Sequence, residues 1–174
     1  MVKISNVENL HLHSKPDIAF SPKRPRIDPN KLSIWAPGQL RLFISHRDEY
    51  RGQATELAQS LKPFGISSFV AHYSIEAMSQ WQRAIVEGLE TMEVALAFIT
   101  DDFYESVWTT QEIGFALGRN VPVISLKLQD QKPCGFVGDI QALHGNLRDP
   151  ASSACAIHRI IADDLGLKNR LQVS

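Results

Sequence analysis

The feature that most limits the fold of this chain is a regular alternation between short apolar runs and segments with helical periodicity. Four runs have the length and composition of buried strands, at residues 41–45, 66–71, 94–99 and 121–126. After each one, apolar residues recur three and four positions apart, as they do along one face of a helix. This pattern predicts βαβ units, and hence an α/β fold with a parallel sheet and helices on both faces.

Single residues predict where some of these helices begin and end. Pro63 and Gly65 should end the helix after the first run, because glycine is favoured just past a helix end and proline cannot continue one. Thr109 or Thr110 is expected to cap the helix after the third run. A looser stretch at residues 129–147 precedes the last predicted helix, and no strand or helix is assigned within it.

The first 38 residues differ from the rest of the chain in composition. They hold five of the nine prolines, and proline disfavours both helix and sheet interiors. We therefore divide the chain into a proline-rich N-terminal arm at residues 1–38 and one domain at residues 39–174. Ile34 and Trp35 suggest that the end of the arm packs on the domain.

Charge, hydropathy and cysteine spacing exclude several classes of protein. Lys and Arg number 18 and Asp and Glu 19, so the chain lacks the broad basic field of non-specific nucleic-acid binding proteins. No apolar run approaches the ~20 residues that span a bilayer, and the N-terminus lacks the apolar core of a secretory signal. Cys134 and Cys155 have no metal-type spacing, and His11 and His13 have no third ligand. We expect no metal site and a cytoplasmic location.

Ligands of parallel α/β sheets bind beyond the carboxyl ends of the strands, so the residues after each run are the candidate site. No glycine-rich phosphate loop and no hydrolase nucleophile elbow occurs in the chain. A response-regulator receiver has a similar layout, but it needs an acidic pair after the first strand to hold Mg²⁺. Residues 45–48 are instead Ser-His-Arg-Asp, which argues against that class.

The most informative segment follows the third run and has the sequence Ser106-Val-Trp-Thr-Thr-Gln-Glu112-Ile. Trp108 and Glu112 are four positions apart, so both project from one face of the predicted helix. An aromatic ring can stack a base while a carboxylate stabilises the cationic transition state of a glycosidic cleavage. From spacing alone, a second interpretation stays open, in which Glu112 is an ordinary surface acid of a first helical turn and Trp108 is core.

Four segments, in the same order and spacing, resemble the TIR domain family: LFISHRD at residues 42–48, GISSFV at 65–70, the Trp108–Glu112 motif, and NVPVI at 120–124. The resemblance has a bacterial character and implies a flavodoxin-like parallel sheet of about five strands with helices on both faces. It also implies an NAD+ nucleosidase or ADP-ribosyl cyclase, which releases nicotinamide and yields ADP-ribose or a cyclic ADP-ribose isomer. NAD+ is then a substrate, and no cofactor is expected.

The same resemblance assigns roles to individual residues. Glu112 matches the catalytic glutamate of the family, and residues 72–79 match a loop that gates the pocket and mediates assembly. The implied substrate-binding residues are Ser45, His46, Arg47, Tyr73, Ser74 and Trp108. Two alternatives stay open from the residues themselves: the His46 ring is satisfied by a carbonyl, or Arg47 pairs with Asp48 or Glu49 on the surface.

The resemblance further implies self-association through TIR–TIR contacts and no nucleic-acid or membrane partner. It suggests a role in bacterial antiphage signalling of the Thoeris-like kind, in which a separate effector detects the product. Two other functions stay open. One is a non-catalytic TIR protein-interaction module, and the other is a relative of the nucleoside deoxyribosyltransferases, which have a similar sheet and a glutamate nucleophile.

Overall fold

The computed structural model describes residues 27–71, 78–128, 142–146 and 148–171. In chain order, the strands and α-helices are β1 (Leu40–Ser45), α1 (Arg51–Leu61), β2 (Ile66–Val70), α2 (Met78–Thr91), β3 (Val94–Ile99), α3 (Val107–Gly118), β4 (Val123–Lys127), β5 (Ala142–His144) and α4 (Pro150–Arg159). The five strands form one sheet in the order β2-β1-β3-β4-β5, and each neighbouring pair is parallel. The predicted flavodoxin-like α/β fold is confirmed.

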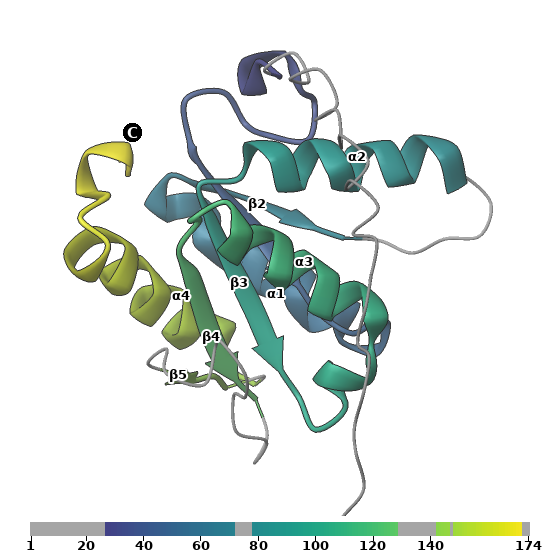
Figure 1. The fold of residues 1–174 in the computed structure, drawn as a ribbon. Helices are drawn as coiled ribbons and strands as arrows, with labels where there is room; N and C mark the ends of the chain where they lie inside the picture. Colours follow the sequence, from purple (N-terminus) through teal and green to yellow (C-terminus); the bar gives the residue numbers. More distant parts are fainter. Residues whose placement is uncertain (1–26, 72–77, 129–141, 147, 172–174) are drawn as a thin grey trace, which may run out of the picture.

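The side chains of β1 alternate between two cores, one on each face of the sheet. Leu40, Leu42 and Ile44 pack with the buried faces of α1 and α4. Phe43 points the other way, into the core that contains the buried residues of α2 and α3. Figure 1 shows α2 and α3 in front of the sheet and α1 behind it. All six residues of β3 are buried, as expected for a central strand covered on both faces.

The predicted end of α1 is confirmed, but the predicted cap of α3 is wrong. Gly65 follows the turn that ends α1 and has a left-handed φ of 71°, which glycine adopts without steric cost. Helix α3 begins earlier than expected, because Ser106 has extended backbone angles and its side chain accepts a hydrogen bond from the Thr109 amide. Thr109 lies inside the helix, where its hydroxyl donates to the carbonyl oxygen of Phe103 at 2.6 Å.

The fifth strand lies in the stretch where no element is predicted. Strand β5 has only three residues, which is too short for a two-residue alternation to stand out from the surrounding sequence. Gly145 follows it, and a Cβ atom there would lie 2.7 Å from Leu128 and 2.8 Å from Leu126. This close approach requires glycine beside β4. Strand β4 itself begins at Val123, and the carbonyl oxygen of Pro122, just before it, accepts a hydrogen bond from the Ala95 amide of β3 at 2.9 Å.

The end of the N-terminal arm packs on the domain. Trp35 is 5% exposed, its ring meets that of Phe69 edge to face, and its Nε1 donates to Thr91 Oγ1 at 2.8 Å. The amide of Ala36 donates to Ser67 Oγ, also at 2.8 Å. Residues 35 and 36 are thus attached to α2 and β2, as the sequence suggests for Trp35. The division into an arm and a domain stays a prediction.

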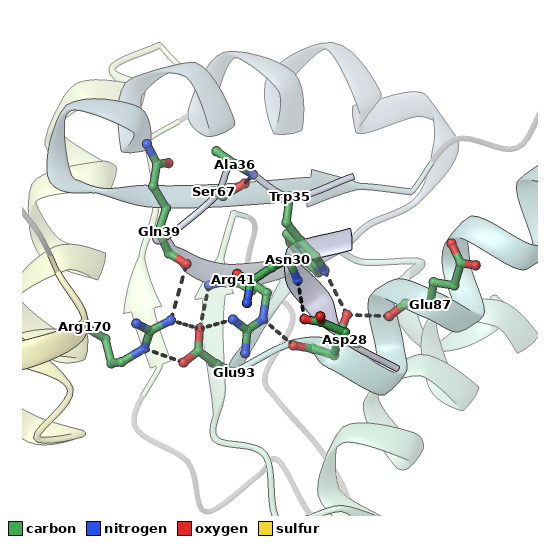
Figure 2. A network of polar contacts seen from close by, with 11 residues as sticks. Asp28, Asn30, Trp35, Ala36, Gln39, Arg41, Ser67, Glu87, Glu93 and Arg170 are labelled. Atoms are coloured by element: carbon green, nitrogen blue, oxygen red, sulfur yellow. Dashed lines mark hydrogen bonds and ion pairs between the residues drawn. The ribbon is translucent and has the colours of Figure 1, made fainter. Parts of the chain in front are cut away.

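At the amino end of the sheet, one carboxylate joins three distant segments (Figure 2). Glu93, just before β3, accepts from Arg170 Nε at 2.7 Å and Nη2 at 3.0 Å, and from the backbone amide of Arg41 at 3.1 Å. Arg41 Nη1 lies 3.3 Å from the same carboxylate, and its Nε donates to the carbonyl of Thr91. Burial favours the neutral form of Glu93, yet hydrogen bonds and charges from Arg170 and Arg41 hold its pKa below the ordinary value.

Candidate functional site

The strand order of the sheet changes direction between β1 and β3, and the carboxyl ends of these two strands lie side by side there. The chain leaves β1 toward β2 on one side, whereas β3 lies on the other side. The connections diverge at such a point and leave a crevice, which is the usual ligand position in open parallel sheets. Ser45 ends β1 and pairs in register with Ala97 of β3. The small Ala97 side chain leaves space for a helix side chain to reach the sheet.

Helix α3 presents one buried stripe to this part of the sheet. The stripe consists of Thr109, Glu112, Ile113 and Ala116, which are spaced three and four apart, as helix geometry requires. Glu112 is the unusual member, because a carboxylate is rarely buried without a hydrogen-bond partner. Its exposure is only 3%. The interpretation of Glu112 as an ordinary surface acid is therefore wrong.

The buried carboxylate of Glu112 meets the hydroxyl of Ser45. Ser45 Oγ donates to Glu112 Oε2 at 2.6 Å, and Ser45 itself is 0% exposed. Ser45 faces α3 because side chains alternate along β1, and it shares the face of Phe43. The bond joins the end of β1 to the second turn of α3, so the predicted catalytic residue and one predicted substrate contact are direct neighbours.

Trp108 lies at the rim of the site and not in the core. It is 47% exposed, so the interpretation as a core residue is wrong. Its ring lines a hollow of about 430 Å³ between α2 and α3. Other residues that line this hollow are Ile85, Val86 and Leu89 from α2, and Glu112 and Phe115 from α3. Trp108 and Glu112 thus face a common space, as their four-residue spacing predicts.

A second hollow, of about 320 Å³, lies beside the first and is more polar. Trp108 lines it together with Ser106 and the residues just after β1, His46 to Glu49. His46 is 1% exposed, and its Nδ1 lies 3.2 Å from the carbonyl oxygen of Ile44. This contact fits the alternative in which a carbonyl satisfies the ring. The His46 ring also meets Phe98 edge to face.

Arg47 pairs with an acid from another strand end. Its Nε donates to Asp102 Oδ2 at 2.8 Å, so the ion pair is with Asp102 and not with Asp48 or Glu49, the alternative that the sequence left open. The cause is the parallel sheet, which brings the segments after β1 and β3 to one edge. Burial favours the neutral form of Asp102, but hydrogen bonds with Thr100, Glu49 and Arg47 keep its pKa below the ordinary value. The hydrogen bond with Asp102 correspondingly raises the pKa of Glu49.

Tyr73 and Ser74, the remaining predicted substrate contacts, lie outside the described residues. The contribution of α2 was missed, because Ile85 and Leu89 fit a helix stripe that serves only the core. The signal available in the sequence was Val86, an apolar residue next to that stripe; in the structure its side chain is 41% exposed. An apolar side chain left exposed beside a regular helical stripe indicates a candidate contact surface.

The described part of the chain shows neither a metal-binding cluster nor a membrane-spanning helix. Within those residues, no three His, Cys, Asp or Glu side chains gather closely enough to hold a metal ion. No helix there combines the length and the apolar composition that crossing a bilayer requires. Among the described residues, the groups at the site are the Glu112 carboxylate, the Ser45 hydroxyl, the Trp108 ring and the Arg47–Asp102 pair.

The fold and the site together define a flavodoxin-like α/β domain with a buried carboxylate at the carboxyl ends of its first and third strands. A family model described as the TIR domain matches residues 42–160, and the chain belongs to this family. Among solved structures, it is similar to the TIR domain of the Toll-related receptor TRR-2 from Hydra magnipapillata. That match has a TM-score of 0.54 and 14% identity, and covers 76% of this chain and 99% of that one. A comparison with curated proteins found no match.

Proposed function

We propose that this TIR domain cleaves the bond between nicotinamide and ribose in NAD+, with Glu112 as the catalytic residue. The C1′–N bond breaks, and its electron pair leaves with the ring nitrogen. The pyridinium cation thereby becomes neutral nicotinamide, so the leaving group needs no proton. Water then adds to C1′ and loses a proton to give ADP-ribose, or an internal nucleophile of the nucleotide adds to give a cyclic isomer.

The observation that carries this proposal is a carboxylate that is nearly inaccessible to bulk water yet lines a hollow. As the ribose becomes a cation, a negative charge close by stabilises the transition state more than the ground state. The effect is larger in a water-poor environment than at the surface, because less solvent screens the charge. Glu112, at 3% exposure, has that environment.

The surroundings of Glu112 suit a dinucleotide. The half-exposed ring of Trp108 offers a flat surface on which a nicotinamide or adenine ring can stack. The mostly apolar hollow between α2 and α3 suits such a ring, and the neighbouring hollow contains the Arg47 guanidinium. Arg47 is about one-third exposed, so it can still approach a phosphate, a contact that planar guanidinium groups favour.

The test is release of nicotinamide by the Glu112→Gln variant. The amide keeps an oxygen that can accept from Ser45, so the fold should persist while the negative charge is lost. We expect release to fall at least ~100-fold, the usual effect of removing one transition-state-stabilising group. Glu105→Gln is the matched control: this acid is exposed in the turn before α3, and its loss should leave the rate within about twofold. Full activity of Glu112→Gln would refute the assignment.

A second candidate is a TIR module that acts only by association. Val107, Trp108 and Phe115 favour it, because these large apolar residues of α3 are 66%, 47% and 38% exposed, and exposed apolar groups mark contact surfaces. Purified protein should be incubated with NAD+ over a range of concentrations. Release that rises more steeply than protein concentration supports catalysis within an assembly, and no release at any concentration supports the module.

Chromatography of the products separates ADP-ribose from a cyclic isomer, the form suited to an antiphage signal for a separate effector.

A further inference from the structure

We propose that Ser45 is a positioning residue, whose hydroxyl holds the Glu112 carboxylate ionised and turned toward the hollow between α2 and α3. This inference rests on the proposed function and deepens it. The family resemblance places Ser45 among the substrate contacts. The geometry assigns it a different role, in which it acts on the substrate through Glu112.

Burial separates Ser45 from any substrate in the described hollows. Ser45 is 0% exposed and lines neither the hollow between α2 and α3 nor the polar hollow beside it. A ligand in the first hollow meets Glu112 and Trp108, and one in the second meets Trp108 and Arg47.

The Ser45 hydroxyl opposes the effect of burial on Glu112. Burial disfavours the charged form of a carboxyl group, whereas a hydrogen bond donated to the carboxylate favours it. The distance of 2.6 Å between Ser45 Oγ and Glu112 Oε2 is typical of a hydroxyl that donates to a charged oxygen. The backbone of Ser45 is fixed in the ladder with β3, so the hydroxyl also limits the orientation of the carboxylate.

The sheet contains a matched control for this serine. Ala97 of β3 pairs in register with Ser45 on one side and with Ser125 of β4 on the other. Neighbouring residues in register point to the same face, so the two serines lie in one row. Ser125 is also 0% exposed, but its hydroxyl has no hydrogen-bond partner within the described part of the chain. Ser125→Ala therefore removes a buried hydroxyl without removing a contact to Glu112.

The experiment compares nicotinamide release from NAD+ by Ser45→Ala and Ser125→Ala over a range of pH. For Ser45→Ala, we expect kcat to fall on the order of 10- to 100-fold, the factor that corresponds to losing a hydrogen bond to a charged group. KM should change less than about twofold, since Ser45 does not contact the substrate and the substrate should bind as before. The acid limb of the kcat profile should move to higher pH, because Glu112 then takes up a proton more readily. Ser125→Ala should match the wild-type protein in kcat, in KM and in the position of the acid limb.

Two outcomes overturn the positioning role: a higher KM with unchanged kcat, or an acid limb that does not move. The double variant Ser45→Ala/Glu112→Gln should lose no more activity than Glu112→Gln alone, because the two residues act as one unit. Full activity of Glu112→Gln refutes the proposed function instead. The Ser45 contact is then tested without turnover, by carboxyl ¹³C NMR titration of Glu112, whose resonance is assigned by its loss in Glu112→Gln. An unchanged titration in Ser45→Ala overturns the inference.

Discussion

The two ends of the parallel sheet hold their carboxylates in different ways. At the amino end, Glu93 lies between two guanidinium groups, with Arg170 in a two-pronged contact and Arg41 bonded through both backbone and side chain (Figure 2). At the carboxyl end, Glu112 accepts from the neutral hydroxyl of Ser45 and borders a hollow. The first arrangement places positive charge directly on the carboxylate, whereas in the second the carboxylate lines a hollow.

Trp35 and Trp108, two tryptophans whose side chains the structure describes, show the same contrast. Trp35 lies toward the amino end with 5% exposure and a bonded indole nitrogen, whereas Trp108 borders the site with 47% exposure. The difference teaches that this fold divides its tasks between the ends of the sheet. Trp35 contributes to stability through closed contacts, whereas the Trp108 ring is left at the surface of a hollow, where a ligand can reach it.

The largest expected effect on stability comes from Trp35→Ala compared with Trp108→Ala. Removing the buried Trp35 ring should lower the free energy of unfolding by about 3–4 kcal/mol, because a cavity remains in the core. Trp108→Ala should cost less than ~1 kcal/mol, since half of the ring is already in water, while it reduces nicotinamide release. Urea unfolding of both variants measures the difference. Equal losses of stability would show that Trp108 serves the core and that the contrast between the two ends is wrong.

The next effect concerns Glu93 and the pH dependence of stability. The pKa of Glu93 is held below its ordinary value of 4.5. The ionised Glu93 therefore makes its full contribution to stability when the pH is above 4.5. The contribution is lost as the pH falls through the lower pKa of the folded state. We expect Glu93→Gln to lower the free energy of unfolding by about 2 kcal/mol near neutral pH, with a smaller difference from the wild type in acid.

Urea unfolding from about pH 7 to about pH 3 measures this convergence. Arg83→Ala is the control, because Arg83 belongs to an exposed pair with Glu87 on α2 that should contribute less than ~0.5 kcal/mol. A difference between Glu93→Gln and the wild type that stays constant down to acid pH would contradict the role of the Glu93 charge.

The smallest effect is expected for Thr91→Val, which removes the acceptor of the Trp35 indole. The variant should lose about 1 kcal/mol, because a buried donor is left without its partner. Thr55→Val is matched to it: Thr55 in α1 is exposed, and both threonines donate to the carbonyl four residues earlier. Thr55→Val should change stability by less than ~0.5 kcal/mol, measured in the same unfolding experiment. Equal effects of the two variants would show that the Trp35 contact contributes nothing.

Local patterns in the sequence determined most of the fold. The apolar run VALAFI predicted the central strand β3. Helix α1 was predicted by the helical spacing of its apolar residues, and its end by Pro63 and Gly65. These features depend on residues within one or two turns of each other. Strand β5 was not predicted, since three residues carry no clear alternation. The cap of α3 was assigned wrongly to Thr109 or Thr110, because Ser106, Thr109 and Thr110 all have side chains that can cap a helix.

The candidate site was only half determined by the sequence. The four-residue spacing of Trp108 and Glu112 predicts that they face a common space, because helix geometry is local. That Glu112 is buried against Ser45, and that Arg47 pairs with Asp102, depends on contacts across 67 and 55 positions of the chain. No local pattern encodes such contacts. They follow from the strand order, which brings the ends of β1 and β3 together beneath α3 and thereby decides which side chains are neighbours.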